Sequence, residues 1–179
     1  MEAHYKISVS ITGIRPLLQN AFTSDTNSSP GKKGQTYDDQ EEAEKRLIKD
    51  SEGTICQPST HIEGALVKSG VEFKFQGKKT YKDIIKAGIL VEPYLIPHSY
   101  TQWVIDKQRV VVNRAGILRC RPRFDSWALD FTILVHEERI QSQILKNILS
   151  NAGRFHGIGD FRPKFGLFEV SSFEVQENI

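Results

Sequence analysis

The stretch WALDFTILVHEERIQSQILKNILSNA, residues 127–152, carries the clearest structural signal in the sequence. Its first nine residues place a large apolar side chain at every second position, which predicts a half-buried strand. The later residues place apolar side chains on one helical face. Glu137 and Glu138 precede that face and suit the positive end of a helix dipole, so we expect them to open a helix that stops at Gly153.

Similar elements lie on both sides of this stretch. Residues 5–12 alternate apolar and polar side chains as a strand does, and residues 166–175 supply a last strand. Residues 59–70, which follow Pro58, form an apolar helical face in which Thr60 and Glu63 have the spacing of a capping box, and Gly70 is placed to stop the helix. With one further strand from the middle of the chain, the order is βαββαβ. We therefore predict an α+β fold of the ferredoxin-like or RRM-like kind, an antiparallel sheet with two helices and an inserted β-hairpin.

Length and composition fit a single globular domain over residues 1–179. The chain is 39% hydrophobic and 26% charged, which is typical of a folded protein. Residues 21–42 are almost entirely polar, and we expect a mobile loop there. Residues 77–124 contain prolines and short apolar runs, and we expect an insertion that carries a basic hairpin.

Charge and cysteine content restrict the class of protein only weakly. A net charge of +2 does not by itself identify a nucleic-acid binder, so the positions of the charges must decide. Cys56 and Cys120 are far apart, and neither belongs to a CxxC pair. We expect free thiols in a reducing, cytoplasmic compartment, with no metal and no cofactor. No apolar run is long enough to span a membrane.

The segment GRFHGIGDFRPKFGLFEV, residues 153–170, combines four glycines with three basic residues. It follows a helix, where the negative dipole end repels anions, so a phosphate-binding loop of the Rossmann or P-loop kind is disfavoured. A helix cap and a tight turn form the simple alternative, which explains Gly153 but not the other glycines. These suggest close approach by another backbone, of nucleic acid or of a neighbouring subunit, and they are Gly157, Gly159 and Gly166.

The segment RVVVNRAGILRCRPRF, residues 109–124, predicts two short strands joined around residues 113–116. If its second strand is extended, three arginines project from one face, namely Arg119, Arg121 and Arg123. Like charges at this spacing repel one another unless they face polyphosphate. The alternative is a solvated edge strand that charge protects from aggregation.

Three segments carry a resemblance to a known family: ISVSITGIRPLL at 7–18, CQPSTHIEGALVKSG at 56–70 and AGRFHGIGDFRPKFGLFEV at 152–170. They resemble the first strand, the opening of the first helix, and the glycine-rich loop with final strand of the RAMP superfamily, the RRM-like proteins of CRISPR effector complexes. The resemblance implies a backbone subunit that polymerises along CRISPR RNA in antiviral defence. The basic hairpin is similar to the thumb of such subunits.

From these patterns and the resemblance, we expect sequence-independent binding of single-stranded RNA, with DNA left open, in a ribonucleoprotein that contains copies of the chain and other effector subunits. No membrane partner is expected. The expected contacts to nucleic acid are Lys68, Arg109, Arg114, Arg119, Arg121, Arg123, Arg154, Gly157, Gly159, Arg162 and Lys164. Exposed aromatic rings would stack on bases, and the candidates are Tyr94, Tyr100, Trp103, Phe155 and Phe161.

No residues form a catalytic pair recognisable in the sequence, so we name no catalytic site. Two alternatives to a binding subunit remain. A RAMP-type endoribonuclease would use a histidine against the ribose 2′-hydroxyl, His61 or His156, or a metal-assisting acid in the polar loop, Asp25, Asp38 or Asp39. The other alternative is a phage-derived structural protein whose basic hairpin contacts an acidic protein partner.

Overall fold

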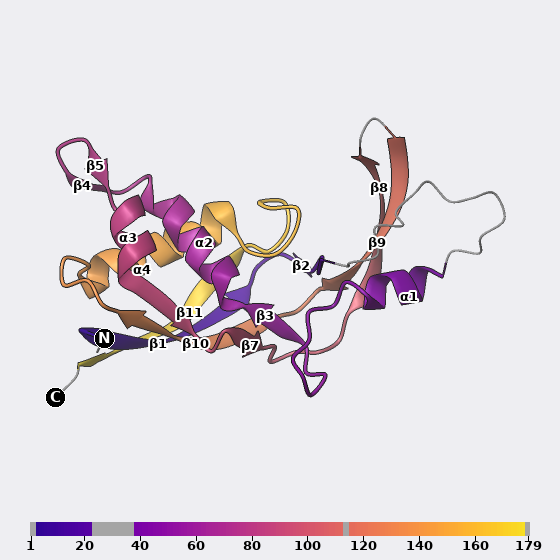
Figure 1. Ribbon diagram of the computed structural model, residues 1–179, viewed down its shortest axis with the longest axis horizontal. Helices are drawn as coiled ribbons and strands as arrows, with labels where there is room; N and C mark the ends of the chain where they lie inside the picture. The colour runs from indigo at the N-terminus through magenta and orange to yellow at the C-terminus, as the bar shows by residue number, and fades with distance from the viewer. Residues whose placement is uncertain (1–2, 23–37, 113–114, 178–179) are drawn as a thin grey trace.

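A computed structural model describes residues 3–22, 38–112 and 115–177, and Figure 1 shows its arrangement. Four antiparallel strands form the central sheet in the order β11-β1-β10-β6. They are β1 (Tyr5–Gly13), β6 (Ile89–Glu92), β10 (Ala128–Val135) and β11 (Phe168–Glu177). The two longest of the described helices, α2 (Ser59–Gly70) and α4 (Ser142–Asn151), connect strands of this sheet. The predicted βαββαβ order and the α+β ferredoxin-like fold are thereby confirmed.

The register of β1 and β10 explains how the core forms. Ile7 pairs with Ile133, Val9 with Phe131 and Ile11 with Leu129, so both alternating patterns turn their apolar side chains to the same face. The helices α2 and α4 cover that face (Figure 1). The Ser69 hydroxyl of α2 donates to the Ile148 carbonyl of α4 at 2.9 Å, which joins the helices inside this layer.

A long β-hairpin projects from this core (Figure 1). It consists of β8 (Val104–Val112) and β9 (Ala115–Phe124), paired in antiparallel register. The two-residue strand β2 (Leu17–Leu18) pairs with the end of β9 and ties the hairpin to the chain that follows β1. The range 77–124 therefore holds the core strand β6 and the helix α3 (Lys82–Gly88) in addition to the hairpin.

Smaller elements complete the structure. The helix α1 (Asp39–Glu44) lies beside the hairpin, and its first residues fall within the predicted loop 21–42, of which residues 23–37 lie outside the described residues. Strands β3 (Cys56–Pro58) and β7 (Leu95–Pro97) pair below α2, and β4 (Lys74–Gln76) pairs with β5 (Lys79–Thr80). A short π-helix, η1 (Ala152–His156), extends α4. In the described part of the chain, no helix has the length and apolar character needed to cross a membrane.

Two predicted helix boundaries are wrong, and one predicted cap does not form. The helix α2 spans Ser59–Gly70 as predicted, but Glu63 accepts a hydrogen bond from the Val91 amide at 2.9 Å instead of closing a capping box with Thr60. Glu137 and Glu138 lie before α4, where the Glu137 carboxylate binds Arg139.

Gly153 does not stop the last helix, because η1 continues through it. The stop is Gly157, whose φ is +68°.

Candidate nucleic-acid interface

The glycine-rich loop, residues 157–167, satisfies its backbone within the chain. The amide of Ile158 donates to the Gly166 carbonyl at 2.9 Å, and the amide of Gly166 donates to the Pro16 carbonyl at 2.8 Å. The amide of Asp160 donates to the Leu18 carbonyl at 2.9 Å. The loop therefore packs on itself and on the segment around β2, and these amides are not available to a phosphate.

The glycines of this loop are explained by the same packing. Gly157, Gly159 and Gly166 have positive φ, which strains a residue with a side chain. A Cβ on Gly159 would lie 2.6 Å from the Leu18 carbonyl oxygen, and one on Gly166 would lie 1.8 Å from that of Ile158. The predicted close approach of a second backbone thus exists, but that backbone is the chain's own. The packing of the chain explains these glycines without a ligand, and the contact of Gly157 and Gly159 with nucleic acid stays a prediction.

The tip of the same loop carries side chains that are exposed. Phe161, Arg162 and Lys164, which we call the loop cluster, are exposed, and Phe161 retains 48% of its accessible surface. The Lys164 ammonium lies 5.8 Å from the centre of the Phe161 ring, which also stacks on Phe165 at 5.8 Å. Neither Arg162 nor Lys164 has a carboxylate partner among the residues that the structure describes. The loop cluster thus offers two uncompensated cations and an exposed aromatic ring.

The N-terminal turn of α2 lies near this cluster. Burial and the positive charge of Arg162 both lower the pKa of His61, burial being the larger cause. The Gln57 side chain lies 2.5 Å from Nδ1 of His61 and orients the ring. Both effects favour the neutral ring of His61, which lies within electrostatic reach of Arg162. Both residues are candidates on sequence grounds, but only the fold brings them together.

The arginines of β9 alternate as predicted, but their environments differ. Arg121 is 4% exposed, and it donates from Nη1 to Asp160 at 2.9 Å and from Nη2 to Asp106 at 3.2 Å. Its charge is compensated, so the prediction that it faces polyphosphate from an exposed strand is wrong. Arg123 is half-buried and forms a two-point ion pair with Asp125. The carboxylates that neutralise Arg121 come from β8 and from the glycine-rich loop, which the sequence of a single strand cannot reveal.

The remaining predicted cations are distributed over the surface. Lys68 on α2, Arg109 on β8 and Arg154 on η1 are exposed, and Arg119 on β9 is half-buried. No described contact joins any of these four side chains to the loop cluster. Arg114 lies outside the described residues.

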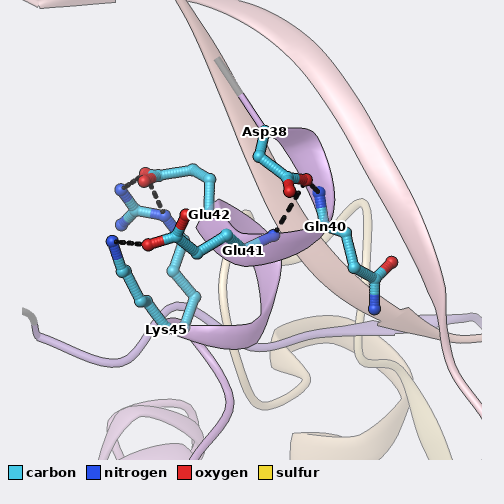
Figure 2. Close-up of polar contacts among 6 residues, drawn as sticks. Asp38, Gln40, Glu41, Glu42 and Lys45 are labelled. Atoms are coloured by element: carbon cyan, nitrogen blue, oxygen red, sulfur yellow. Dashed lines mark hydrogen bonds and ion pairs between the residues drawn. The ribbon is translucent and has the colours of Figure 1, made fainter. Parts of the chain in front are cut away.

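The acidic candidates in the polar loop have structural partners. Figure 2 shows Asp38 at the N-terminus of α1, where its carboxylate accepts from the amides of Gln40 and Glu41 at 2.9 and 3.3 Å. Asp39 binds the Lys107 ammonium of β8 at 2.7 Å, and hydrogen bonds from Lys107 and from the Cys120 thiol lower its pKa. Both acids thus serve α1 and its contact with the hairpin. Asp25 lies outside the described residues.

The other histidine candidate also has a partner, since Nε2 of His156 lies 2.8 Å from the Glu72 carboxylate. Within residues 3–22, 38–112 and 115–177, no three His, Cys, Asp or Glu side chains are placed to hold a metal ion. Cys56 and Cys120 are buried free thiols. The described residues therefore bring together no pair of the predicted catalytic candidates.

The face of the sheet opposite the helices is acidic, which the sequence interpretation missed. A shallow depression there is lined by Ser8, Ser10, Glu92, Asp130, Thr132 and Glu174, among others. RRM domains bind RNA through aromatic side chains on this face, whereas three carboxylates in this place repel phosphate. The alternating polar residues of β1 and β10 were a signal for it, but the cross-strand register was needed to assemble them.

No protein-family model matches the chain, and no curated protein matches it in sequence. Solved structures do match its fold. One is a chain of the cryo-EM structure of the Type III-B Cmr-beta complex bound to cognate target RNA, with a TM-score of 0.63 and 12% sequence identity. The alignment covers 98% of this chain but 61% of that chain, so this protein spans about three fifths of its neighbour's length. The likeness shows that the chain has a fold found in a CRISPR effector complex.

Proposed function

We propose that the chain is a sequence-independent, single-stranded RNA-binding subunit of a CRISPR-type ribonucleoprotein, belongs to the RAMP superfamily, and assembles with copies of itself and with other effector subunits. The observation that carries this proposal is the loop cluster. Arg162 and Lys164 are exposed cations without a carboxylate partner in the described residues, and Phe161 is an exposed ring beside Lys164. Cations that bind phosphates and a ring that stacks on a base are the two elements of single-strand recognition.

The fold supports the same proposal. Nearly the whole chain aligns with a subunit of a complex that was solved with its target RNA. The hairpin, which projects away from the sheet (Figure 1), carries the exposed Arg109 and the half-buried Arg119. We therefore place RNA along the loop cluster, the exposed side of α2 and the hairpin. Binding is independent of sequence because these cations contact phosphates, which every nucleotide carries.

The test is the affinity for fluorescently labelled RNAs of equal length and two unrelated sequences, measured by anisotropy at several salt concentrations. We expect equal affinities for both sequences and a steep loss with salt. The double variant R162A/K164A should bind about tenfold more weakly, with a slope of log K against log salt that is shallower by about 1.4. The exposed Lys79 of β5 gives the matched control K79A, which should bind as the wild type does. A flat salt dependence, or equal affinities of the two variants, would overturn the proposal.

A ribonuclease is a second candidate, which His61 favours. Its lowered pKa favours the neutral imidazole, and the ring lies near Arg162, as a general base beside a phosphate-binding cation would. Incubation of end-labelled RNA with the protein, with and without Mg²⁺, decides between the candidates. Cleavage that is lost in H61A identifies a nuclease, whereas intact RNA that remains bound supports the binding subunit alone.

A further inference from the structure

An open groove lies at the root of the hairpin, apart from the loop cluster. It has a volume of about 850 Å³ and is lined by the connection from β7 to β8 and by the turn from β9 to β10. The lining residues that matter to its chemistry are Tyr100, Gln102, Trp103, Arg123, Asp125 and Ser126. Known small-molecule sites have volumes of about 300–1,000 Å³, so the groove is large enough for a planar heterocycle with its sugar.

The walls of the groove are held in place by the core. Trp103 is half-buried and packs against core residues, and the amide of Ser99 donates to the Ala128 carbonyl at 3.2 Å. Asp125 receives Nε and Nη2 of Arg123 at 2.8 and 3.3 Å, which fixes the plane of the guanidinium. The groove is therefore formed before any ligand arrives, and the cost of ordering it on binding is small.

The free groups in the groove indicate which ligand suits it. Tyr100 is 54% exposed, and among the described residues neither its hydroxyl, nor the Gln102 amide, nor the Trp103 indole N–H has a hydrogen-bond partner. The charges of the described lining, those of Arg123 and Asp125, cancel each other. A phosphate gains little in such a place, and an aliphatic chain leaves the polar groups unsatisfied. An uncharged, planar ring with polar edges satisfies both the aromatic and the polar groups.

We propose that this groove binds an unstacked nucleobase of the RNA strand, with Tyr100 and Trp103 as its aromatic walls and Gln102 and Arg123 at its polar edge. The inference rests on the proposed function, because it names the subsite in which a bound strand places one of its bases. It assigns recognition of the base to the root of the hairpin and recognition of phosphate to the loop cluster. Stacking tolerates any base, so the subsite remains compatible with binding that is independent of sequence.

The experiment compares a short oligouridylate with the abasic oligomer of equal length, whose ribose-phosphate chain is unchanged. Y100A should bind oligouridylate at least about fivefold more weakly and bind the abasic oligomer as the wild type does, since the base loses one of its two stacking rings. Y100F keeps the ring and should bind both oligomers normally. F22A, at an exposed aromatic ring outside the groove, is the matched control and should also bind both normally.

A spectroscopic measurement checks the location. The chain contains two tryptophans, of which Trp127 is 1% exposed, so quenching by a stacked base reports on Trp103. Oligouridylate should quench this fluorescence and the abasic oligomer should not. Unchanged affinity of Y100A for oligouridylate, or an equal loss of affinity for both oligomers, overturns the assignment of the groove as a base-binding subsite. The proposed function stands in that case. A wild-type protein that binds neither oligomer overturns the proposed function, and the inference with it.

Discussion

Arg121 of the hairpin donates a hydrogen bond from Nη1 to the carboxylate of Asp160 in the glycine-rich loop, 39 residues later in the chain, at 2.9 Å. The Arg121 side chain is 5% exposed and also binds Asp106 of β8. A buried charge with fixed partners is costly to unpair, so this pair joins the root of the hairpin to the loop in one definite geometry.

The first prediction concerns this pair. R121M removes the guanidinium, leaves Asp106 buried without a cation, and should lower the free energy of unfolding by about 3–5 kcal/mol. Arg123 lies two positions away on the same face of β9, but its pair with Asp125 is more exposed. R123M should therefore cost no more than about 1 kcal/mol in the same urea unfolding experiment. Similar losses in the two variants would contradict the assignment of Arg121 as the structural arginine.

The second prediction concerns Gly166. Its φ is +75°, and a Cβ there would lie 1.8 Å from the Ile158 carbonyl oxygen, in a turn that the Ile158 amide closes by donating to the Gly166 carbonyl. G166A should therefore destabilise the protein by about 2–5 kcal/mol, from the left-handed backbone and the clash together. Thermal unfolding of G166A and the wild type measures this loss of stability. Gly77 has φ +59°, but a Cβ added there would meet no atom within 4 Å, so G77A isolates the cost of the backbone and should lose clearly less.

Gly64 gives a prediction of the opposite sign for stability. It lies in the interior of α2, is exposed, and has no atom within 4 Å of an added Cβ. G64A should stabilise the fold by about 0.5–1 kcal/mol, because glycine costs conformational entropy in a helix. If RNA lies along this side of α2, the same methyl group should weaken RNA binding severalfold. Higher stability together with unchanged RNA affinity would show that the bound RNA does not lie along α2.

The fourth prediction is a pH dependence. Burial lowers the pKa of His98 to about 4, its ring packs on Phe124, and its Nδ1 has no hydrogen-bond partner among the described residues. The folded state thus favours the neutral ring, while the unfolded chain takes up a proton near pH 6.5. Stability from this group is complete above pH 6.5 and is lost as the pH falls toward 4, by about 2 kcal/mol at pH 5. Urea unfolding of the wild type and of H98Q at pH 7 and pH 5 checks this pH dependence. The free energy of unfolding should fall less from pH 7 to pH 5 in H98Q than in the wild type.

Much of the fold could be predicted because its signals are local. The alternation in residues 5–12 and 127–135 defines two central strands without reference to any other part of the chain. The strand β6 could not be assigned with the same clarity, because it has four residues and lies between a helix and a proline. The cap of α2 and the start of α4 could not be predicted for a related reason. Glu63 and Glu137 bind partners that local capping patterns do not include, and these contacts override the capping preferences.

The candidate interface likewise contains residues whose exposure the sequence predicts and residues whose environment depends on tertiary contacts. Exposure of Arg162 and Lys164 follows from a polar loop tip, and the sequence was sufficient to name them. Burial of Arg121 depends on Asp106 and Asp160, two carboxylates that approach from separate segments, so no pattern within β9 could distinguish it from Arg119. The number of glycines indicates close approach by a backbone, but only the tertiary structure shows that the chain's own backbone approaches them.

The pairing of Arg121 with Asp160 also has a mechanical consequence. A hinge motion of the hairpin would have to pull the guanidinium from a carboxylate that is anchored through the Asp160 amide to Leu18. The hairpin root and the loop tip therefore move as one body. A polymer that binds both the hairpin root and the loop tip therefore meets them at a constant separation.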